Sequence, residues 1–175
     1  YTSAQGDLAV REAIAEYINS TYGESVTADC LYMSVGAAAA LTSSLTALVS
    51  PGEEVIVPSP YFPEYKVFIE RCGGVIREVS CGARLQLDTK AIEKAINEKT
   101  AAIIINSPNN PTGAVYSEEN IKALADVLRR CEEKYSHPIY LISDEPYREL
   151  VYDGVTVPFI PGIYDNTIVC YSYSK

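Results

Sequence analysis

Short apolar segments that are typical of strands alternate with amphipathic segments that are typical of helices along the whole sequence. Each apolar run is followed by glycine, proline, asparagine or serine, the residues that commonly end a strand. Such alternation favours a largely parallel sheet with helices on both faces. We therefore predict an α/β fold with three layers, α/β/α. The expected strands are residues 31–35, 54–57, 75–79, 101–105, 139–142 and 167–171, and the expected helices are 7–19, 37–49, 64–71, 88–97 and one that Ser117 begins.

Composition narrows the class of protein. The 175 residues, 47% of them hydrophobic, are enough to bury the core of one domain, and the formal charge of −9 opposes binding to nucleic acid or to an anionic membrane. The longest aliphatic runs are far shorter than the roughly 18 residues of a membrane span. Five scattered cysteines and a single histidine give no metal-ligand spacing, so we expect no metal and a reducing, cytoplasmic environment.

The segment Ile139–Tyr147 passes abruptly from apolar residues to an acid and a phenol. Asp144 falls at the carboxyl end of the expected strand, which is where open α/β sheets collect ligands, and Tyr147 follows three residues later. The last expected strand leads to Lys175, which hydroxyl residues precede. Taken singly, Asp144 could cap a turn, Tyr147 could belong to the core and Lys175 could be a solvated lysine.

Glycine-rich or polar stretches follow five of the expected strands directly. Because the carboxyl ends of parallel strands meet at one edge of a sheet, these stretches are expected to converge on one crevice. Taken individually, two of these stretches have a simpler explanation. Residues 109–113 could form an ordinary turn, and Gly36 could be a turn glycine. The five are Gly36 and residues 58–63, 106–113, 143–147 and 172–175.

Three motifs in fixed order give the chain a family resemblance. Asn-Pro-Thr-Gly at 110–113, Asp-Glu-Pro-Tyr at 144–147 and Ser-Tyr-Ser-Lys at 172–175 are separated by roughly thirty residues each time. In this the sequence resembles the class I/II, fold type I, pyridoxal-phosphate-dependent aminotransferases of the aspartate aminotransferase type, over essentially its whole length. Tyr1, Gly6, Arg11 and the Pro60-Tyr61-Phe62 segment fit the same family. The resemblance implies that residues 1–175 are the cofactor-binding large domain, in incomplete form.

The resemblance assigns catalytic roles to three residues. Lys175 would form a Schiff base with the cofactor aldehyde and then carry the proton between the substrate Cα and the cofactor. Asp144 would pair with the pyridine nitrogen and keep it protonated, which strengthens the ring as an electron acceptor. Tyr147, together with Asn110, would hydrogen-bond the phenolic oxygen of the cofactor.

Further residues would hold the cofactor in place. Phe62 would stack on its ring, although burial in the core is the default for any phenylalanine. The phosphate would rest on the first turn of the expected helix, at Gly36, Ala37 and Ala38, where backbone amides and the helix dipole favour an anion. Helix packing alone would also account for small residues there.

The hydroxyls and the amino terminus complete the implied site. Ser172, and more weakly Ser174, would add side-chain donors to the phosphate. Tyr1 resembles a family tyrosine that reaches the phosphate of the neighbouring subunit, which implies a homodimer. At a chain terminus, it would equally be expected to be poorly ordered.

The implied activity is the transfer of an amino group between an L-amino acid and a 2-oxo acid by a ping-pong mechanism. The family continues beyond the Schiff-base lysine with a further strand and a small domain, so we expect these residues to be a fragment that cannot turn over by itself. Two alternatives stay open. One is a β-lyase with the same cofactor, and the other is a non-enzymatic aminotransferase-like domain of a transcriptional regulator.

Overall fold

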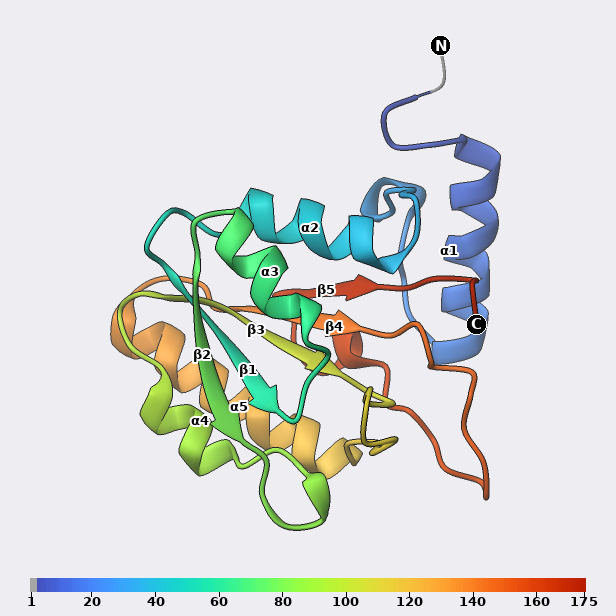
Figure 1. The fold of residues 1–175 in the computed structure, drawn as a ribbon. Coiled ribbons are helices and arrows are strands. Elements are labelled where there is room, and N and C mark those ends of the chain that lie inside the picture. Colours follow the sequence, from blue (N-terminus) through green and yellow to red (C-terminus); the bar gives the residue numbers. More distant parts are fainter. Residues whose placement is uncertain (1–2) are drawn as a thin grey trace. The chain divides into compact units, whose positions relative to one another are not determined.

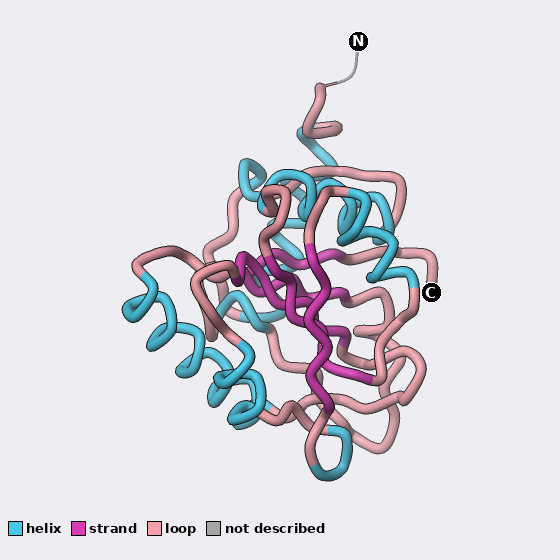
Figure 2. Tube along the Cα trace, turned by 60° about the vertical axis from the view of Figure 1, so that its left-hand side comes forward, coloured by secondary structure: helices cyan, strands magenta, loops and turns pink. Residues whose placement is uncertain are grey.

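A five-stranded sheet forms the centre of residues 36–175 in the computed structural model, which describes residues 3–175 (Figures 1 and 2). Its spatial order is β2-β1-β3-β4-β5, and all four pairs of neighbours are parallel. The predicted parallel sheet is therefore confirmed. The strands are β1 (Glu54–Ser59), β2 (Val75–Ser80), β3 (Thr100–Asn106), β4 (Tyr140–Asp144) and β5 (Thr167–Cys170).

Helices cover both faces of this sheet, as the three-layer prediction requires (Figure 2). One face packs against α2 (Ala37–Leu48) and α3 (Glu64–Arg71). The opposite face packs against α4 (Thr89–Ala95) and α5 (Glu118–Tyr135). Short 3-10 turns, η2 (Ala83–Leu85) and η3 (Ile160–Gly162), lie in the connections.

The central strand β3 shows how the two cores are separated. Every residue of β3 is buried, which is usual for a parallel strand covered on both sides. Because successive side chains point to opposite faces, Ile103 and Ile105 join the core with α4 and α5, whereas Ala102 and Ile104 join the core with α2 and α3. An unbroken apolar run therefore contributes to both layers.

Side-chain caps begin three of the helices where the sequence predicts them. Asp7 accepts a hydrogen bond from Val10 N (3.2 Å) at the start of α1 (Leu8–Tyr22), and Asp88 accepts one from Ala91 N (2.9 Å) at the start of α4. Ser117 caps α5 in the same way. Each cap satisfies a backbone donor that the first turn of a helix leaves unpaired, which stabilises the helix by about 1 kcal/mol.

Residues 3–35 form a unit of their own, with α1 and the turn η1 (Ala28–Cys30). Arg11 is buried in this unit and donates to the carbonyl of Ala28 (2.6 Å). Gly6 has φ +97°, and a Cβ there would lie 2.4 Å from Met33 Cγ, so a side chain would clash. The predicted role of Tyr1 concerns a residue outside those that the structure describes.

The predicted strand at residues 31–35 is wrong. The segment is irregular, and its backbone amide at Met33 donates to Gln5 O (2.9 Å) rather than to a sheet. Tyr32 and Val35 are exposed, so the apolar run has no covered face that would hold it in a ladder. An apolar composition alone was therefore misleading.

The described residues contain no helix that is both long and apolar enough to cross a membrane. Within the same part of the chain, no three His, Cys, Asp or Glu side chains are grouped so that they could hold a metal ion.

Candidate active site

The carboxyl ends of all five parallel strands lie along one edge of the sheet (Figure 1). At this edge the last residue of β3, Asn106, is in register with Asp144 of β4, and Asp144 is in register with Cys170 of β5. The polar stretches that follow β1, β3, β4 and β5 therefore begin at the same edge, as predicted. Gly36 is the exception to the expected pattern, because residues 3–35 contain no strand.

Asp144 is a buried carboxylate with one oxygen unpaired. Its exposed fraction is 5%, and the Tyr65 hydroxyl donates a short hydrogen bond to Oδ2. Oδ1 is buried as well and has no hydrogen-bond partner among the described residues. Burial raises the pKa of Asp144 from its usual 3.8 to about 6; the hydrogen bond from Tyr65 opposes the rise, and the charge of Glu145 adds to it. A buried acceptor in this state is suited to a donor from a ligand.

Tyr65 comes from α3, on the face of the sheet that α2 also covers. Its ring is 1% exposed and is stacked against Tyr61, with centroids 6.3 Å apart. Phe62 meets the same ring edge-on at 5.7 Å and is itself half-buried. Burial and the neighbouring Asp144 raise the pKa of Tyr65 well above its usual value, so its hydroxyl stays protonated and donates.

Asn106 connects Asp144 to the loop that follows β3. Its side-chain amide donates to the backbone carbonyl of Asp144 (2.8 Å), and its Oδ1 accepts from Asn110 N (2.6 Å). The Asn110 amide in turn donates to the Tyr147 hydroxyl at 3.5 Å, a long contact. Two residues predicted to share one task, Asn110 and Tyr147, are therefore neighbours, 37 positions apart in sequence.

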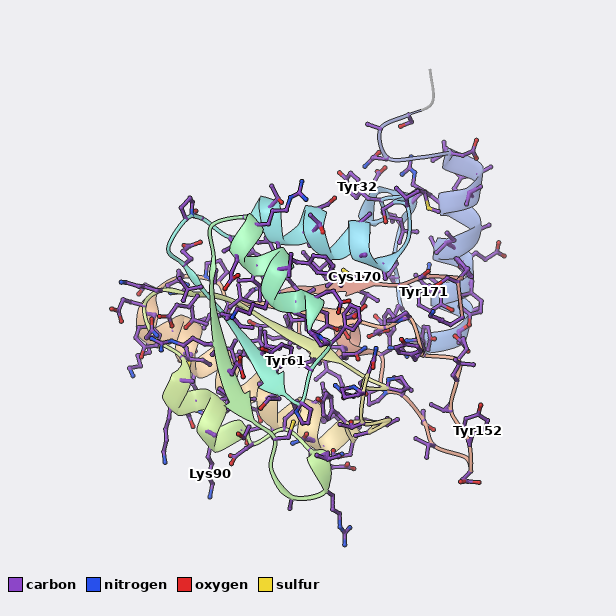
Figure 3. All side chains as sticks on the ribbon, viewed as in Figure 1. Tyr32, Tyr61, Lys90, Tyr152, Cys170 and Tyr171 are labelled. Carbon is purple, nitrogen blue, oxygen red and sulfur yellow. The ribbon has the colours of Figure 1, made fainter. Side chains whose placement is uncertain are left out.

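The carboxylate next in sequence, Glu145, is fully paired. Ser143 Oγ donates to its Oε1 (2.6 Å), and Arg148 Nε donates to its Oε2 (2.5 Å). Arg148 also donates to the carbonyls of Val157 (3.1 Å) and Pro158 (2.9 Å), so the pair ties the loop after β4 together. The outer part of this loop carries Tyr152, which is exposed (Figure 3).

Side-chain alternation along β4 keeps these two carboxylates apart. Ile142 belongs to the core with α2 and α3, and Asp144, two residues later, contacts Tyr65 of α3. Leu141 belongs to the opposite core. Ser143 and Glu145 follow it at intervals of two residues, so they lie on the same side of the strand as Leu141, and they form a hydrogen bond with each other. Adjacent acids therefore serve different layers of the fold.

The remaining predicted residues lie at the end of β5 and at the start of α2. Ser172 and Ser174 hydrogen-bond each other through their hydroxyls (2.9 Å), and Lys175 is exposed. Within the described residues, Lys175 makes no hydrogen bond or ion pair with Asp144 or Tyr147. Gly36 precedes α2 with φ +84° and offers no side-chain cap, and Ala37 and Ala38 form the first turn. Cys170, at the end of β5, is buried near Ser44 of α2 (Figure 3).

Three contributors to the site were not singled out from the sequence. Tyr65 could have been found, because Tyr65 and Ile69 are four positions apart and so share one face of a predicted helix, and a buried phenol needs an acceptor. Asn106 ends a buried strand, which is the same signal that identified Asp144. Arg148 had a local signal as well, because Glu145 lies three residues earlier, whereas its bonds to two carbonyls of an irregular loop depend on the fold.

Comparison with known proteins shows the family to which the chain belongs. The family model for aminotransferase class I and II matches residues 1–175, and the chain belongs to that family. A crystal structure of an amino transferase from Eubacterium rectale superposes with a TM-score of 0.98 at 54% identity and covers 100% of this chain. Aspartate aminotransferase from Thermus thermophilus with maleate superposes with a TM-score of 0.87 at 36% identity, also over 100% of this chain.

A relative in sequence extends the same pattern. The aspartate/prephenate aminotransferase of Thermus thermophilus is 39% identical over 93% of this chain. The chain spans 40% of that protein, and 44% and 45% of the two solved structures, which is less than half of each. What these residues show directly is therefore a family and part of its fold.

Proposed function

We propose that the protein containing this chain is an aminotransferase that uses pyridoxal 5'-phosphate, and that residues 1–175 are part of its cofactor-binding large domain. The observation that carries the proposal is the buried Oδ1 of Asp144 at the carboxyl end of β4, which has no hydrogen-bond partner in the described part of the chain. An unpaired buried carboxylate oxygen destabilises a fold unless a ligand supplies its donor. The protonated ring nitrogen of pyridoxal phosphate is such a donor.

The other polar groups suit the remaining parts of that cofactor. Asn110 and Tyr147 form a pair of hydroxyl and amide groups that would bind the phenolic oxygen. The first turn of α2, at Ala37 and Ala38, offers backbone amides and the positive end of a helix dipole to the phosphate. Phe62, half-buried beside Tyr65, would cover the ring. Ser172 and Ser174 would add hydroxyl donors to the phosphate.

The bound cofactor supplies an electron sink for the bonds at the substrate Cα. Lys175 would hold the cofactor covalently through its Nζ and would move the proton at the substrate Cα. Asp144, ionised, would keep the ring nitrogen protonated, and Tyr147 would help to set the proton affinity near Lys175.

The substrates follow from the reaction class. We infer an L-amino acid and a 2-oxo acid, and we take aspartate as the first donor to test because a relative and a solved structure carry aspartate in their names. The full protein is proposed to be a cytoplasmic homodimer in which Tyr1 reaches the phosphate of the neighbouring subunit. Neither nucleic acid nor a membrane is an expected partner of a chain with a formal charge of −9.

A reductive trapping experiment on the full-length protein tests the proposal. The protein is incubated with pyridoxal phosphate, reduced with borohydride and mapped by peptide mass, with Lys175→Ala as the variant and Lys90→Ala as the matched control. Lys90 is an exposed lysine of α4, on the opposite face of the sheet from α2 (Figure 3). We expect an adduct on Lys175 that only Lys175→Ala removes. An adduct spread over many lysines would contradict the assignment.

Product analysis then identifies the reaction. With aspartate and 2-oxoglutarate, an aminotransferase yields oxaloacetate and glutamate in equal amounts and releases no ammonia. Release of ammonia with pyruvate from a substrate with a β leaving group, without amino transfer, would instead establish a lyase.

A further inference from the structure

We propose that Tyr65 is the positioning residue that fixes how Asp144 meets the cofactor. It holds Oδ2, so that only Oδ1 is available to the ring nitrogen. The proposal rests on the proposed function, because it assigns a task within the same site. Its basis is the hydrogen bond from the Tyr65 hydroxyl to Oδ2, together with the absence of a partner on Oδ1 within the described chain.

The direction of this hydrogen bond is fixed, with Tyr65 as the donor and Asp144 as the acceptor. Tyr65 is buried beside a carboxylate, and both conditions raise the pKa of its hydroxyl well above the usual value, so it remains a donor. Oδ2 must then accept, and any proton on Asp144 has to occupy Oδ1. A proton on Oδ1 and the ring nitrogen of the cofactor therefore compete for the same oxygen. Cofactor binding should consequently weaken as pH falls through the range in which Asp144 takes up a proton.

Other titratable groups near Asp144 do not share this role. Cys170, in register with Asp144 on β5, has its pKa raised to about 12 by burial, so it is a neutral thiol. Glu145 raises the pKa of Asp144 through its charge, but Arg148 and Ser143 occupy both of its oxygens. Tyr65 opposes the rise in the pKa of Asp144, because its hydrogen bond stabilises the ionised carboxylate.

Packing holds the Tyr65 hydroxyl in this position. The ring contacts Tyr61, stacked at 6.3 Å, and Phe62, edge-on at 5.7 Å, and α3 anchors it in the core with Ile69. Tyr61 is itself fixed, because its hydroxyl donates to Glu78 of β2 (2.6 Å). The aromatic group that would cover the cofactor and the acid that would bind its nitrogen are therefore aligned by one side chain.

The test compares Tyr65→Phe with Tyr164→Phe in the full-length protein. Both changes remove one hydroxyl from a buried ring, but the Tyr164 hydroxyl donates to the carbonyl of Ile139 (2.6 Å) and does not contact Asp144. The dissociation constant of pyridoxal phosphate is measured between pH 5 and 8. A hydrogen bond to a charged acceptor predicts a roughly tenfold or larger increase for Tyr65→Phe, with the loss of affinity at low pH beginning about one pH unit higher. Tyr164→Phe should match the wild type.

A second measurement needs no cofactor. The pKa of the Asp144 carboxyl, followed by carbon NMR in cofactor-free protein and assigned with Asp144→Asn, should rise in Tyr65→Phe and stay unchanged in Tyr164→Phe. In addition, Tyr65→Phe should have little further effect on cofactor affinity in an Asp144→Asn background, since both act through one contact.

The outcomes separate the two proposals. Suppose that the wild type binds the cofactor at Lys175. If Tyr65→Phe then leaves the Asp144 pKa or the dissociation constant of the cofactor unchanged, the role of Tyr65 is overturned and the proposed function stays intact. A wild type that does not bind pyridoxal phosphate would overturn the proposed function and the cofactor role of Tyr65 together. If Tyr65→Phe reduced cofactor affinity by the same factor in the wild type and in Asp144→Asn, the role of Tyr65 would also be overturned.

Discussion

Asp144 and Glu145 are neighbouring carboxylates, both almost completely buried, yet their surroundings differ in kind. Glu145 has a partner on each oxygen, and one of these is the guanidinium of Arg148. Among residues 3–175, Asp144 has a neutral donor on one oxygen and none on the other. A fold can keep the first arrangement for its own stability, whereas the second costs stability unless a ligand completes it. The difference separates an acid that the fold itself satisfies from one that we propose a ligand completes.

The largest expected effect comes from breaking the structural pair. Arg148→Met leaves Glu145 charged and buried without its cation, and we expect the free energy of unfolding to fall by about 3–5 kcal/mol in denaturant titrations. Arg130→Met is the control: its ion pair with Glu93 is exposed, so the loss should be at most about 1 kcal/mol.

A double variant sharpens this test. Glu145→Leu with Arg148→Met removes both charges, and it should recover part of the stability that Arg148→Met loses. If the double variant is less stable than Arg148→Met by the full cost of a second core mutation, the unpaired charge is not the cause.

Asp144 should make the free energy of unfolding depend on pH in the cofactor-free protein. Because its folded-state pKa is raised from 3.8 to about 6, Asp144 holds its proton more tightly in the native state than in the unfolded state. Its contribution is therefore most favourable below about pH 4 and is lost as pH rises through about 6. The difference corresponds to about 3 kcal/mol.

Unfolding of wild type and Asp144→Asn at pH 4 and pH 7 measures this contribution. The stability of the wild type relative to the variant should fall by about that amount between the two pH values. A constant difference would mean that Asp144 titrates in the folded protein as it does in water. Saturating pyridoxal phosphate should reduce the effect, since a donor on Oδ1 favours the ionised form.

The smallest expected effect on stability concerns Tyr147, which, like Asp144, we propose contacts the cofactor. Tyr147→Phe removes only a long, partly exposed contact with Asn110, so stability should change by less than about 0.5 kcal/mol. Amino transfer should nevertheless slow by roughly tenfold, because the hydroxyl is assigned to the cofactor. Equal kcat values for variant and wild type would remove Tyr147 from the site.

Much of the fold followed from local signals in the sequence. The helix 64–71 was predicted with the bounds that α3 has, and Asp7, Asp88 and Ser117 were recognised as caps, because helix starts depend on side chains within one turn. The strand at 31–35 failed for the opposite reason. A strand needs a neighbour with which to pair, and nothing within five residues reports whether one is present.

The place of the candidate site in the fold was predictable to the same degree. Asp144 and Tyr147 lie close to the end of one strand, so a strand boundary and a motif were enough to single them out. The bond from Tyr65 to Asp144 spans 79 positions, and it depends on how α3 packs on the sheet. Placing that hydroxyl requires the three-dimensional arrangement of helix and strand, which periodicity alone does not supply.

The alternation of side chains along β4 also determines which kinds of sequence change this site can tolerate. The two acids have separate hydrogen-bond partners, so a substitution of either one leaves the hydrogen bonds of the other in place. Deleting a single residue within β4 would invert the parity of every position that follows, and it would exchange the environments of Asp144 and Glu145. The acid suited to a ligand would then face α5, and the other would face Tyr65 without its arginine. Related sequences should therefore vary in length in the loops around β4 and keep the length of the strand itself.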